Sequence, residues 1–159
     1  MKIRPYRPSD LETLKTITAI CFDGVCIDQN IEQLYGLIHG QDWRWRKRRH
    51  IDDDAAINAA GIFVAEEDGQ IVGYVTTRVD AAAKVGGIPN FAVLPAFQQR
   101  GIGRKLLEKA VAYLAAEGMQ FARIETLAQN EVGAHFYPKF GFQEVARQVH
   151  YVMPIASND

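Results

Sequence analysis

The 159-residue sequence has little cysteine and no long apolar run. Its two cysteines, Cys21 and Cys26, are too few for a disulfide framework or a grouped zinc site. We therefore expect reduced thiols in a cytoplasmic protein and no bound metal. No apolar run approaches the roughly 20 residues that cross a bilayer. The first ten residues also lack the apolar segment of a secretory signal, so no export is expected.

An excess of charge of one sign is also missing. Lys and Arg number 18, Asp and Glu number 19, and the formal net charge is −1. Such a balance gives no overall attraction to nucleic acid or to a membrane, so neither is expected as a partner. Apolar residues make up 48% of the chain, which is enough for a sizeable core. Without repeats or linkers, residues 1–159 are predicted to form one domain.

Hydrophobic spacing predicts alternating strands and helices. Residues 41–60 fit no clear period and are predicted as a loop with helical pieces. Asp68-Gly69 predicts a tight turn between two hairpin arms. Strands are expected at 2–6, 62–65, 71–79, 88–94 and 121–127, with one or two closing strands in 141–155, and helices at 8–22, 30–40, 101–117 and 130–140.

The predicted order is thus β-α-α-β-β-β-α-β-α-β-β. The strands at 88–94 and 121–127 flank a helix, so they should be parallel and joined by a right-handed crossover. The hairpin before them is antiparallel. The fold class is therefore mixed α/β, with a central mixed sheet of six to seven strands and helices on both faces.

The most informative stretch is QQRGIGRK at residues 98–105, between a predicted strand and the strongest predicted helix. The first turn of a helix carries about four unpaired N–H groups and the positive end of the helix dipole. Gly101 and Gly103 remove side chains that would keep an anion from these donors. Arg100 and Arg104 add positive charge. The pattern predicts a phosphate-binding turn, and a glycine-softened helix start with exposed basic residues is the alternative.

Two common phosphate-binding motifs do not fit, because the P-loop spacing is absent and Leu106 replaces the third glycine of a dinucleotide fingerprint. Q-Q-R-G-I-G instead resembles the [QR]-x-x-G-x-[GA] signature of the GCN5-related N-acetyltransferase (GNAT) superfamily. In that superfamily the signature binds the pyrophosphate of acetyl-coenzyme A. A second stretch, QNEVGAHFYPKFGF, resembles another family signature, with Asn130, Tyr137 and Gly141-Phe142 in step. The element order also agrees from residue 2 to about residue 154.

The resemblance implies an N-acetyltransferase that uses acetyl-coenzyme A as co-substrate, without a metal. A primary amine would attack the thioester directly in a ternary complex. The backbone of Phe91, Ala92 and Val93 would align the pantetheine arm, and an N–H near Val93 would polarise the thioester carbonyl. Asn130 would bind the pantetheine or the loop beside it. The turn residues assigned to the coenzyme are Gln98, Gln99, Arg100, Gly101, Ile102, Gly103 and Arg104.

By the same resemblance, Tyr137 contacts the coenzyme and is the general acid that protonates its departing sulfur. Reference pKa values of about 10 for tyrosine and 8.5 for a thiol allow this transfer. Pro138 departs from the family pattern and predicts a kink at this point. Glu125 aligns with the glutamate that accepts a proton in relatives acetylating ribosomal protein N-termini. A surface carboxylate, with deprotonation through water, is the alternative for Glu125.

The acceptor is a small-molecule or peptide amine whose identity the sequence leaves open. In the family, the acceptor side is built largely by the region equivalent to 21–60. RWRKRR at 44–49 fits a solvated or gating loop, an acceptor wall favouring acidic substrates, or a nucleic-acid patch. The resemblance also admits a homodimer, without an interface signal. The alternative function is a catalytically degenerate sensor that binds acyl-coenzyme A, for which Pro138 is the support.

Overall fold

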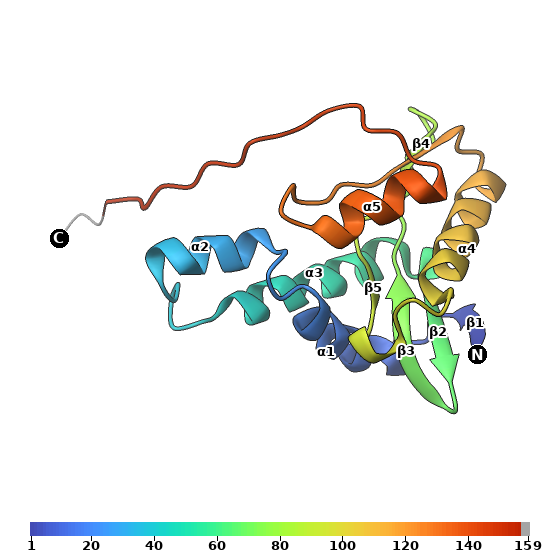
Figure 1. Ribbon diagram of the computed structural model, residues 1–159, viewed down its shortest axis with the longest axis horizontal. Coiled ribbons are helices and arrows are strands. Elements are labelled where there is room, and N and C mark those ends of the chain that lie inside the picture. The colour runs from blue at the N-terminus through green and yellow to red at the C-terminus, as the bar shows by residue number, and fades with distance from the viewer. Residues whose placement is uncertain (157–159) are drawn as a thin grey trace.

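The computed structural model describes residues 1–156, so the last three residues of the predicted domain 1–159 lie outside the described residues. Its strands form two sheets with helices on both faces (Figure 1), which confirms the mixed α/β class. The strands are β1 (Lys2–Pro5), β2 (Phe63–Glu67), β3 (Gln70–Val75), β4 (Val85–Gly87), β5 (Phe91–Val93) and β6 (Phe121–Arg123); the helices are α1 (Leu11–Cys21), α2 (Ile27–Tyr35), α3 (Trp43–Asn58), α4 (Ile102–Ala116) and α5 (Glu131–Phe140).

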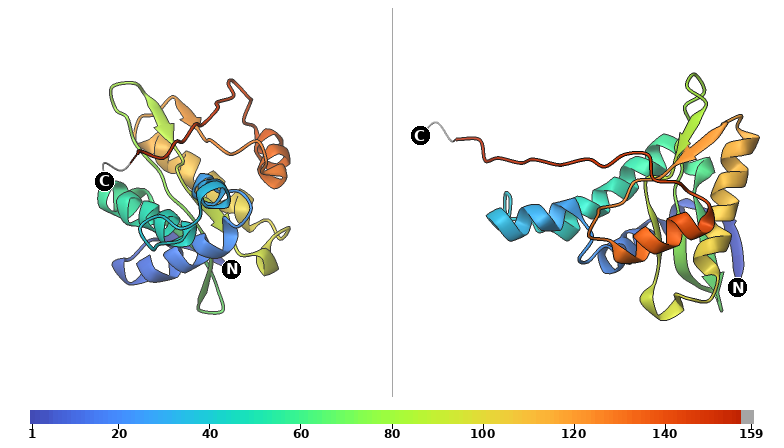
Figure 2. Two further views of the ribbon diagram at one scale, coloured as in Figure 1. Left: turned by 90° about the vertical axis from the view of Figure 1, so that its left-hand side faces the viewer. Right: turned by 45° about the horizontal axis from the view of Figure 1, so that its top comes forward.

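The larger sheet is antiparallel in the order β1-β2-β3-β5, and the smaller one pairs β4 with β6 in parallel. Successive strand residues point to opposite faces. Val64 and Tyr74 therefore pack with α1 and α3, whereas Phe63 and Val75 pack with α4. Figure 2 shows this sandwich from two further sides, with α5 beside α4. No helix within residues 1–156 is both long and apolar enough to cross a membrane.

Two local predictions are confirmed by backbone geometry. Asp68 and Gly69 join β2 to β3 with φ values of 50° and 76°, the positive pair that a tight hairpin turn needs. Helix α4 begins after Gly101 and is followed by Gly118, both with positive φ. The parallel partner of β6 is β4, at residues 85–87, rather than the strand predicted at 88–94, which corresponds to β5 and pairs with β3.

The prediction of a loop with helical pieces at 41–60 is wrong, because α3 runs unbroken from Trp43 to Asn58. Its buried positions are Trp43, Lys47, Ile51 and Asp54, which have helical spacing. Two of these four side chains are charged, so no apolar period shows in the sequence. The basic residues of 44–49 thus belong to a helix rather than to a gating loop.

The predicted closing strands within 141–155 are also absent from the structure. Residues 143–156 form neither helix nor strand and extend away from the sheets alongside α2 (Figures 1 and 2). The Tyr35 hydroxyl donates a hydrogen bond of 3.4 Å to the Val152 carbonyl. A strand needs a hydrogen-bonded partner strand to persist. Among the described residues, no strand pairs with this segment. The strand expected at 121–127 is shorter and ends at Arg123.

A buried polar cluster connects α3 to the sheet, and removing its central carboxylate tests its contribution. Asp54 accepts hydrogen bonds from Thr76 Oγ1 (2.8 Å), Asn90 Nδ2 (2.7 Å) and Arg78 Nη2 (2.7 Å). Asp54→Ala leaves these donors unpaired, and we expect a loss of about 3 kcal/mol in the free energy of unfolding. Urea denaturation measures it. The exposed neighbour Asp53→Ala is the control, and equal effects of both variants would contradict this assignment.

Candidate active site

A β-bulge separates two strand edges that would otherwise stay paired. Arg78 and Gly87 exchange two backbone hydrogen bonds, of 2.8 and 2.9 Å, and Thr76 N donates to Asn90 O at 2.8 Å. Between these two pairs, the first strand runs two residues, from Thr76 to Arg78. The second strand runs three residues, from Gly87 to Asn90. One extra residue therefore lies between Gly87 and Asn90. This stretch contains Pro89, and a bulge is one of the few positions in a sheet that tolerates proline.

The strand changes its hydrogen-bonding partner across the bulge. Before it, β4 pairs in parallel with β6, and Ile88 N donates to Arg123 O at 3.0 Å. After it, β5 pairs with β3, and residues 124–128 follow β6 without pairing to β5. The region that separates β5 from 124–128 is the candidate cleft.

The backbone of β5 directs two residues toward this cleft. Thr76 N donates to Asn90 O and Leu94 N donates to Val72 O, so residues 90, 92 and 94 direct their backbone groups to β3. By strand alternation, the N–H groups of Phe91 and Val93 point to the open edge. The Val93 carbonyl accepts from Cys21 Sγ (3.4 Å) and Gln98 Nε2 (3.0 Å). The Val93 N–H is the donor at this position that faces the cleft.

The N-terminus of α4 lies next to β5. Gly101 is the N-cap with φ of 81°, and the first intrahelical bond is from Lys105 N to the Gly101 carbonyl. The N–H groups of residues 102–104 therefore have no intrahelical acceptor. A Cβ on Gly103 would lie 3.1 Å from Phe91 Cζ, whereas one on Gly101 would meet nothing within 4 Å. Gly103 allows the close approach to Phe91, and Gly101 supplies the left-handed backbone.

The other residues of the glycine turn have structural partners of their own. Gln99 has φ of 62°, and Ile102 is buried in the core. Arg100 pairs with Glu67 at 2.9 Å, and Arg104 lies 3.4 Å from Glu108. Both guanidinium groups remain about half exposed. The turn therefore combines free backbone N–H donors with two arginines, and the neighbouring carboxylates partly neutralise the positive charge of these arginines.

Tyr137 lies on α5 in an aromatic cluster that closes one side of the cleft. Its ring centroid is 6.4 Å from that of Phe91 and 6.0 Å from that of Phe142. Burial raises the pKa of Tyr137 to about 12. Helix α5 continues through Pro138 to Phe140, so the proline does not end the helix at Tyr137.

Sequence reasoning missed Gly133, which stands four residues before Tyr137 on the same helix face. A Cβ there would lie 2.8 Å from Asn130 Nδ2 and 3.0 Å from Tyr137 Cε2. Glycine therefore permits the contact of both side chains with the helix. The signal available in the sequence was its place three residues after the signature asparagine.

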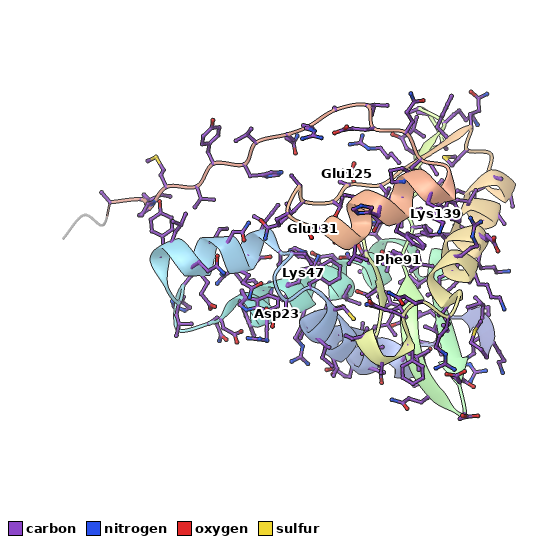
Figure 3. All side chains as sticks on the ribbon, viewed as in Figure 1. Asp23, Lys47, Phe91, Glu125, Glu131 and Lys139 are labelled. Carbon is purple, nitrogen blue, oxygen red and sulfur yellow. The ribbon has the colours of Figure 1, made fainter. Side chains whose placement is uncertain are left out.

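Asn130 and Glu125 occupy the segment that leads from β6 into α5. Asn130 Oδ1 caps α5 by accepting from Gly133 N (3.0 Å), and its Nδ2 donates to Thr126 Oγ1 (2.8 Å). Glu125 is exposed and forms an ion pair with Arg123 at 2.6 Å. In Figure 3, Glu125 lies on the segment before α5, and Phe91 lies on the strand beneath that helix. The side-chain partner of Glu125 is thus Arg123, whereas Tyr137 and Phe91 contact each other in the aromatic cluster.

A second polar group beside β5 was also missed. Lys47 Nζ donates to Asn90 Oδ1 at 2.8 Å, and burial lowers the pKa of Lys47. Asn90 immediately precedes β5, and its side chain lies on the α3 face of the sheet. Because charged residues rarely occupy buried helix positions, sequence reasoning did not select Lys47. A cavity of about 260 Å³ adjoins this group and is lined by Lys47, His50, Asp53, Asp54, Arg78, Pro89 and Asn90.

An α/β domain with splayed strands beside a glycine-led helix start is the class of fold that the resemblance to acyltransferases implied. Residues 29–142 match the model of the acetyltransferase (GNAT) family, and the chain belongs to that family. A mycothiol acetyltransferase from Streptomyces avermitilis is 32% identical over 98 residues, or 60% of this chain and 32% of that protein. The chain thus spans about a third of the length of that curated relative.

Solved structures share the fold. The crystal structure of PH1933 from Pyrococcus horikoshii OT3 has a TM-score of 0.73 and 25% identity, covering 93% of this chain and 92% of that one. The PaiA N-acetyltransferase from Thermoplasma acidophilum, crystallised with coenzyme A, has a TM-score of 0.71 and 22% identity, covering 89% of each chain.

The raised pKa of Tyr137 predicts a pH dependence of stability. Above pH 10 the unfolded chain ionises this phenol, whereas the folded chain keeps it protonated up to about pH 12. The stability of the wild type should therefore fall relative to Tyr137→Phe as pH rises from 9 to 11, by at most about 1.4 kcal/mol. Urea denaturation of both proteins at the two pH values measures this difference. A difference that does not change with pH would mean that water reaches the phenol freely.

Proposed function

We propose that the chain is an acetyl-coenzyme A-dependent N-acetyltransferase that acts on a primary amine. The observation that carries the proposal is the open edge of β5 beside the N-terminus of α4. The edge supplies backbone hydrogen bonds for an extended amide-containing arm, and the helix start supplies donors for a diphosphate. Coenzyme A carries both chemical groups, and the family match and the coenzyme-bound relative support the same ligand.

The residues at the turn fit a diphosphate. Gly101 leaves open space in front of the free N–H groups of residues 102–104, and Arg100 and Arg104 remain half exposed at its rim. The helix dipole adds positive potential at the same point. Gln98 and Ile102 hold the turn in place through the Val93 carbonyl and the core, respectively.

The reaction we propose is direct attack of a neutral amine on the thioester carbonyl. The Val93 N–H, which points into the cleft, would stabilise the oxyanion that forms there. Tyr137 would protonate the departing thiolate, since burial keeps its phenol protonated at neutral pH. Apolar surroundings also raise the pKa of a thiol, so the pKa values of the tyrosine donor and the thiolate acceptor become more similar.

The attacking amine must lose a proton, and this proton needs an acceptor. The exposure of Glu125 and its ion pair with Arg123 favour a surface role for this carboxylate. We therefore propose that the amine loses its proton to water, which suits an α-amine with a pKa of about 7.7 to 8.0. The acceptor would be a small-molecule or peptide amine, and the protein would act in the cytoplasm.

Nucleic acid is the weaker candidate for the basic stretch at 44–49. Arg46 pairs with Asp28 at 3.2 Å, and Arg44 lies 3.6 Å from Asp23. Lys47 is buried against Asn90. With three of its cations engaged inside the domain, the stretch offers little free charge for phosphates.

Binding of coenzyme A is tested by calorimetry with a pair of glycine variants. Gly103→Ala places a methyl group 3.1 Å from Phe91 Cζ, so Phe91 or the turn must move by a few tenths of an ångström, and we expect about a tenfold loss of affinity. Gly87→Ala is the control, because its Cβ would make an ordinary contact of 3.6 Å with Arg78. Absence of heat from the wild-type protein would reject the proposed ligand.

Turnover is tested with acetyl-coenzyme A and a panel of amines, by following thiol release. The panel contains N-terminal peptides, lysine peptides, polyamines and aminoglycosides. Tyr137→Phe should lower kcat roughly 10²- to 10⁴-fold while leaving KM for acetyl-coenzyme A nearly unchanged. Tight binding without turnover across the panel would support the alternative, a sensor of acyl-coenzyme A. An unchanged kcat would remove Tyr137 from the mechanism.

A further inference from the structure

The cavity of about 260 Å³ beside Lys47, here called the bulge cavity, lies between α3 and the bulge. Pro89 and Asn90 line it from the bulge, and Lys47 and Asp54 line it from α3. Sites that enclose a whole drug-sized ligand measure about 300–1,000 Å³. The bulge cavity therefore suits one end of a molecule rather than a whole ligand.

Lys47 brings a positive charge to the bulge cavity, and its side-chain partners are uncharged. The residue is 9% exposed, and its Nζ donates to Asn90 Oδ1 at 2.8 Å. Nζ also lies 3.4 Å from His50 Nδ1 and 4.1 Å from the centroid of the Phe22 ring. An ammonium group has three N–H donors. One donor therefore remains for a ligand after Asn90 and His50.

Arg78 supplies a second unused donor to the same cavity. Within residues 1–156, its Nε is the one buried side-chain nitrogen or oxygen that has no hydrogen-bond partner. Its Nη2 donates to Asp54 Oδ1 at 2.7 Å, which holds the guanidinium in place. Buried polar atoms are nearly always hydrogen-bonded. The Arg78 Nε–H thus calls for an acceptor that the described residues do not supply.

The buried charges of the bulge cavity leave an excess of one positive charge. Asp54 Oδ1 accepts from Arg78, and Asp54 Oδ2 accepts from Thr76 and Asn90. Both carboxylate oxygens are therefore occupied, and the charges of Asp54 and Arg78 offset each other. The charge of Lys47 remains, and a buried charge is costly unless it is paired.

The two other titratable residues of the bulge cavity do not change this balance. Burial lowers the pKa of His50, and the nearby charge of Lys47 lowers it further, so the ring is neutral at pH 7. Asp53 is exposed at the rim, where water and salt screen its charge. The cavity thus favours a group with a single negative charge, and carboxylate oxygens bind strongly to lysine and arginine N–H groups.

The bulge cavity lies near the proposed reacting centre along β5. Asn90 precedes Val93, whose N–H faces the cleft, by three residues, so about 10 Å of extended strand separates the two positions. In the view of Figure 3, Lys47 lies on α3 between α2 and Phe91. A short acceptor would therefore reach both the Val93 N–H and the cavity.

We propose that the bulge cavity binds a carboxylate of the acceptor, held by Lys47 Nζ and Arg78 Nε. The acceptor is then an amine that carries a carboxylate about 10 Å from its reacting nitrogen, as in an extended tripeptide. This inference rests on the proposed function, because it assigns the substrate class of the same site.

Binding is tested by NMR of the isotope-labelled full-length protein, titrated with propionate in the absence of acetyl-coenzyme A. Propionamide, which has the same shape without the charge, is the matched ligand control, and sodium chloride keeps the ionic strength constant. Propionate should shift the Arg78 Nε–H resonance, which Arg78→Lys identifies by removing it. Propionamide should leave this resonance in place. Equal shifts with the two ligands would overturn the proposal.

Two variants on α3 separate the cavity from a general effect of charge. Lys47→Met keeps the length of the side chain and should bind propionate about tenfold more weakly. Arg49→Met, an equal change of charge at an exposed position, should bind as the wild type does. Circular dichroism checks that each variant folds. Arg78→Lys keeps a cation for Asp54 without the Nε–H and gives a second measure of the loss. Wild-type affinity in both Lys47→Met and Arg78→Lys would reject the cavity as the site.

The link to the acceptor is tested by thiol release from acetyl-coenzyme A with triglycine and with triglycinamide. Triglycine should have about a tenfold higher kcat/KM, and the preference should disappear in Lys47→Met and persist in Arg49→Met. Equal kcat/KM values in the wild type would overturn the assignment to the acceptor. Thiol release without propionate binding would reject the carboxylate site alone. Propionate binding without thiol release from any amine would support that site and reject the proposed function.

Discussion

One extra residue between Gly87 and Asn90 is the constraint on which the rest of the site depends. Without it, the strand that begins at Val85 would remain in register with β3 on one side and with β6 on the other. The bulge changes the direction of the strand, so β5 keeps its bonds to β3 while its outer edge separates from residues 124–128. The free N–H groups of Phe91 and Val93, and the space in front of α4, follow from this change. A ligand that forms backbone hydrogen bonds therefore meets an edge that is open without any loop having to move.

The bulge is held by polar groups buried under the sheet. Asn90 N donates to Thr76 Oγ1 at 3.0 Å. The side-chain hydroxyl thus accepts the hydrogen bond of a backbone N–H that has no backbone acceptor at the altered register. Asp54 binds Thr76 and the Asn90 amide together, and Lys47 donates to Asn90 from the same helix. Buried charges are costly unless paired and hydrogen-bonded. Their presence directly under the bulge indicates that α3 holds the strand in its bent form. Helix α3 thus contributes to the cleft through the sheet, even though its basic outer residues lie elsewhere.

The sequence was informative where local chemistry decides the structure, and much less so where partners distant in the chain decide it. The hairpin at Asp68-Gly69 and the start of α4 at Gly101 depend on residues that tolerate positive φ, so they were predicted with nearly correct limits. Helix α3 was missed because Lys47 and Asp54 occupy inner positions, and only their distant partners Asn90 and Arg78 make that burial acceptable. The bulge was missed for the same reason, since it is defined by a register between Thr76 and Asn90. Glu125 aligned with a catalytic residue, yet its neighbour Arg123 binds it at the surface.

The open edges of β5 and β6 differ in chemistry. At β5 the open edge is short, faces Gly103, and borders a helix start that favours negative charge. These features favour a thin, anionic ligand. At β6 the exposed Phe121 offers an apolar surface, and no helix of the described residues begins beside it. The chemistry of the β5 edge thus favours a small anionic ligand, and that of the β6 edge does not.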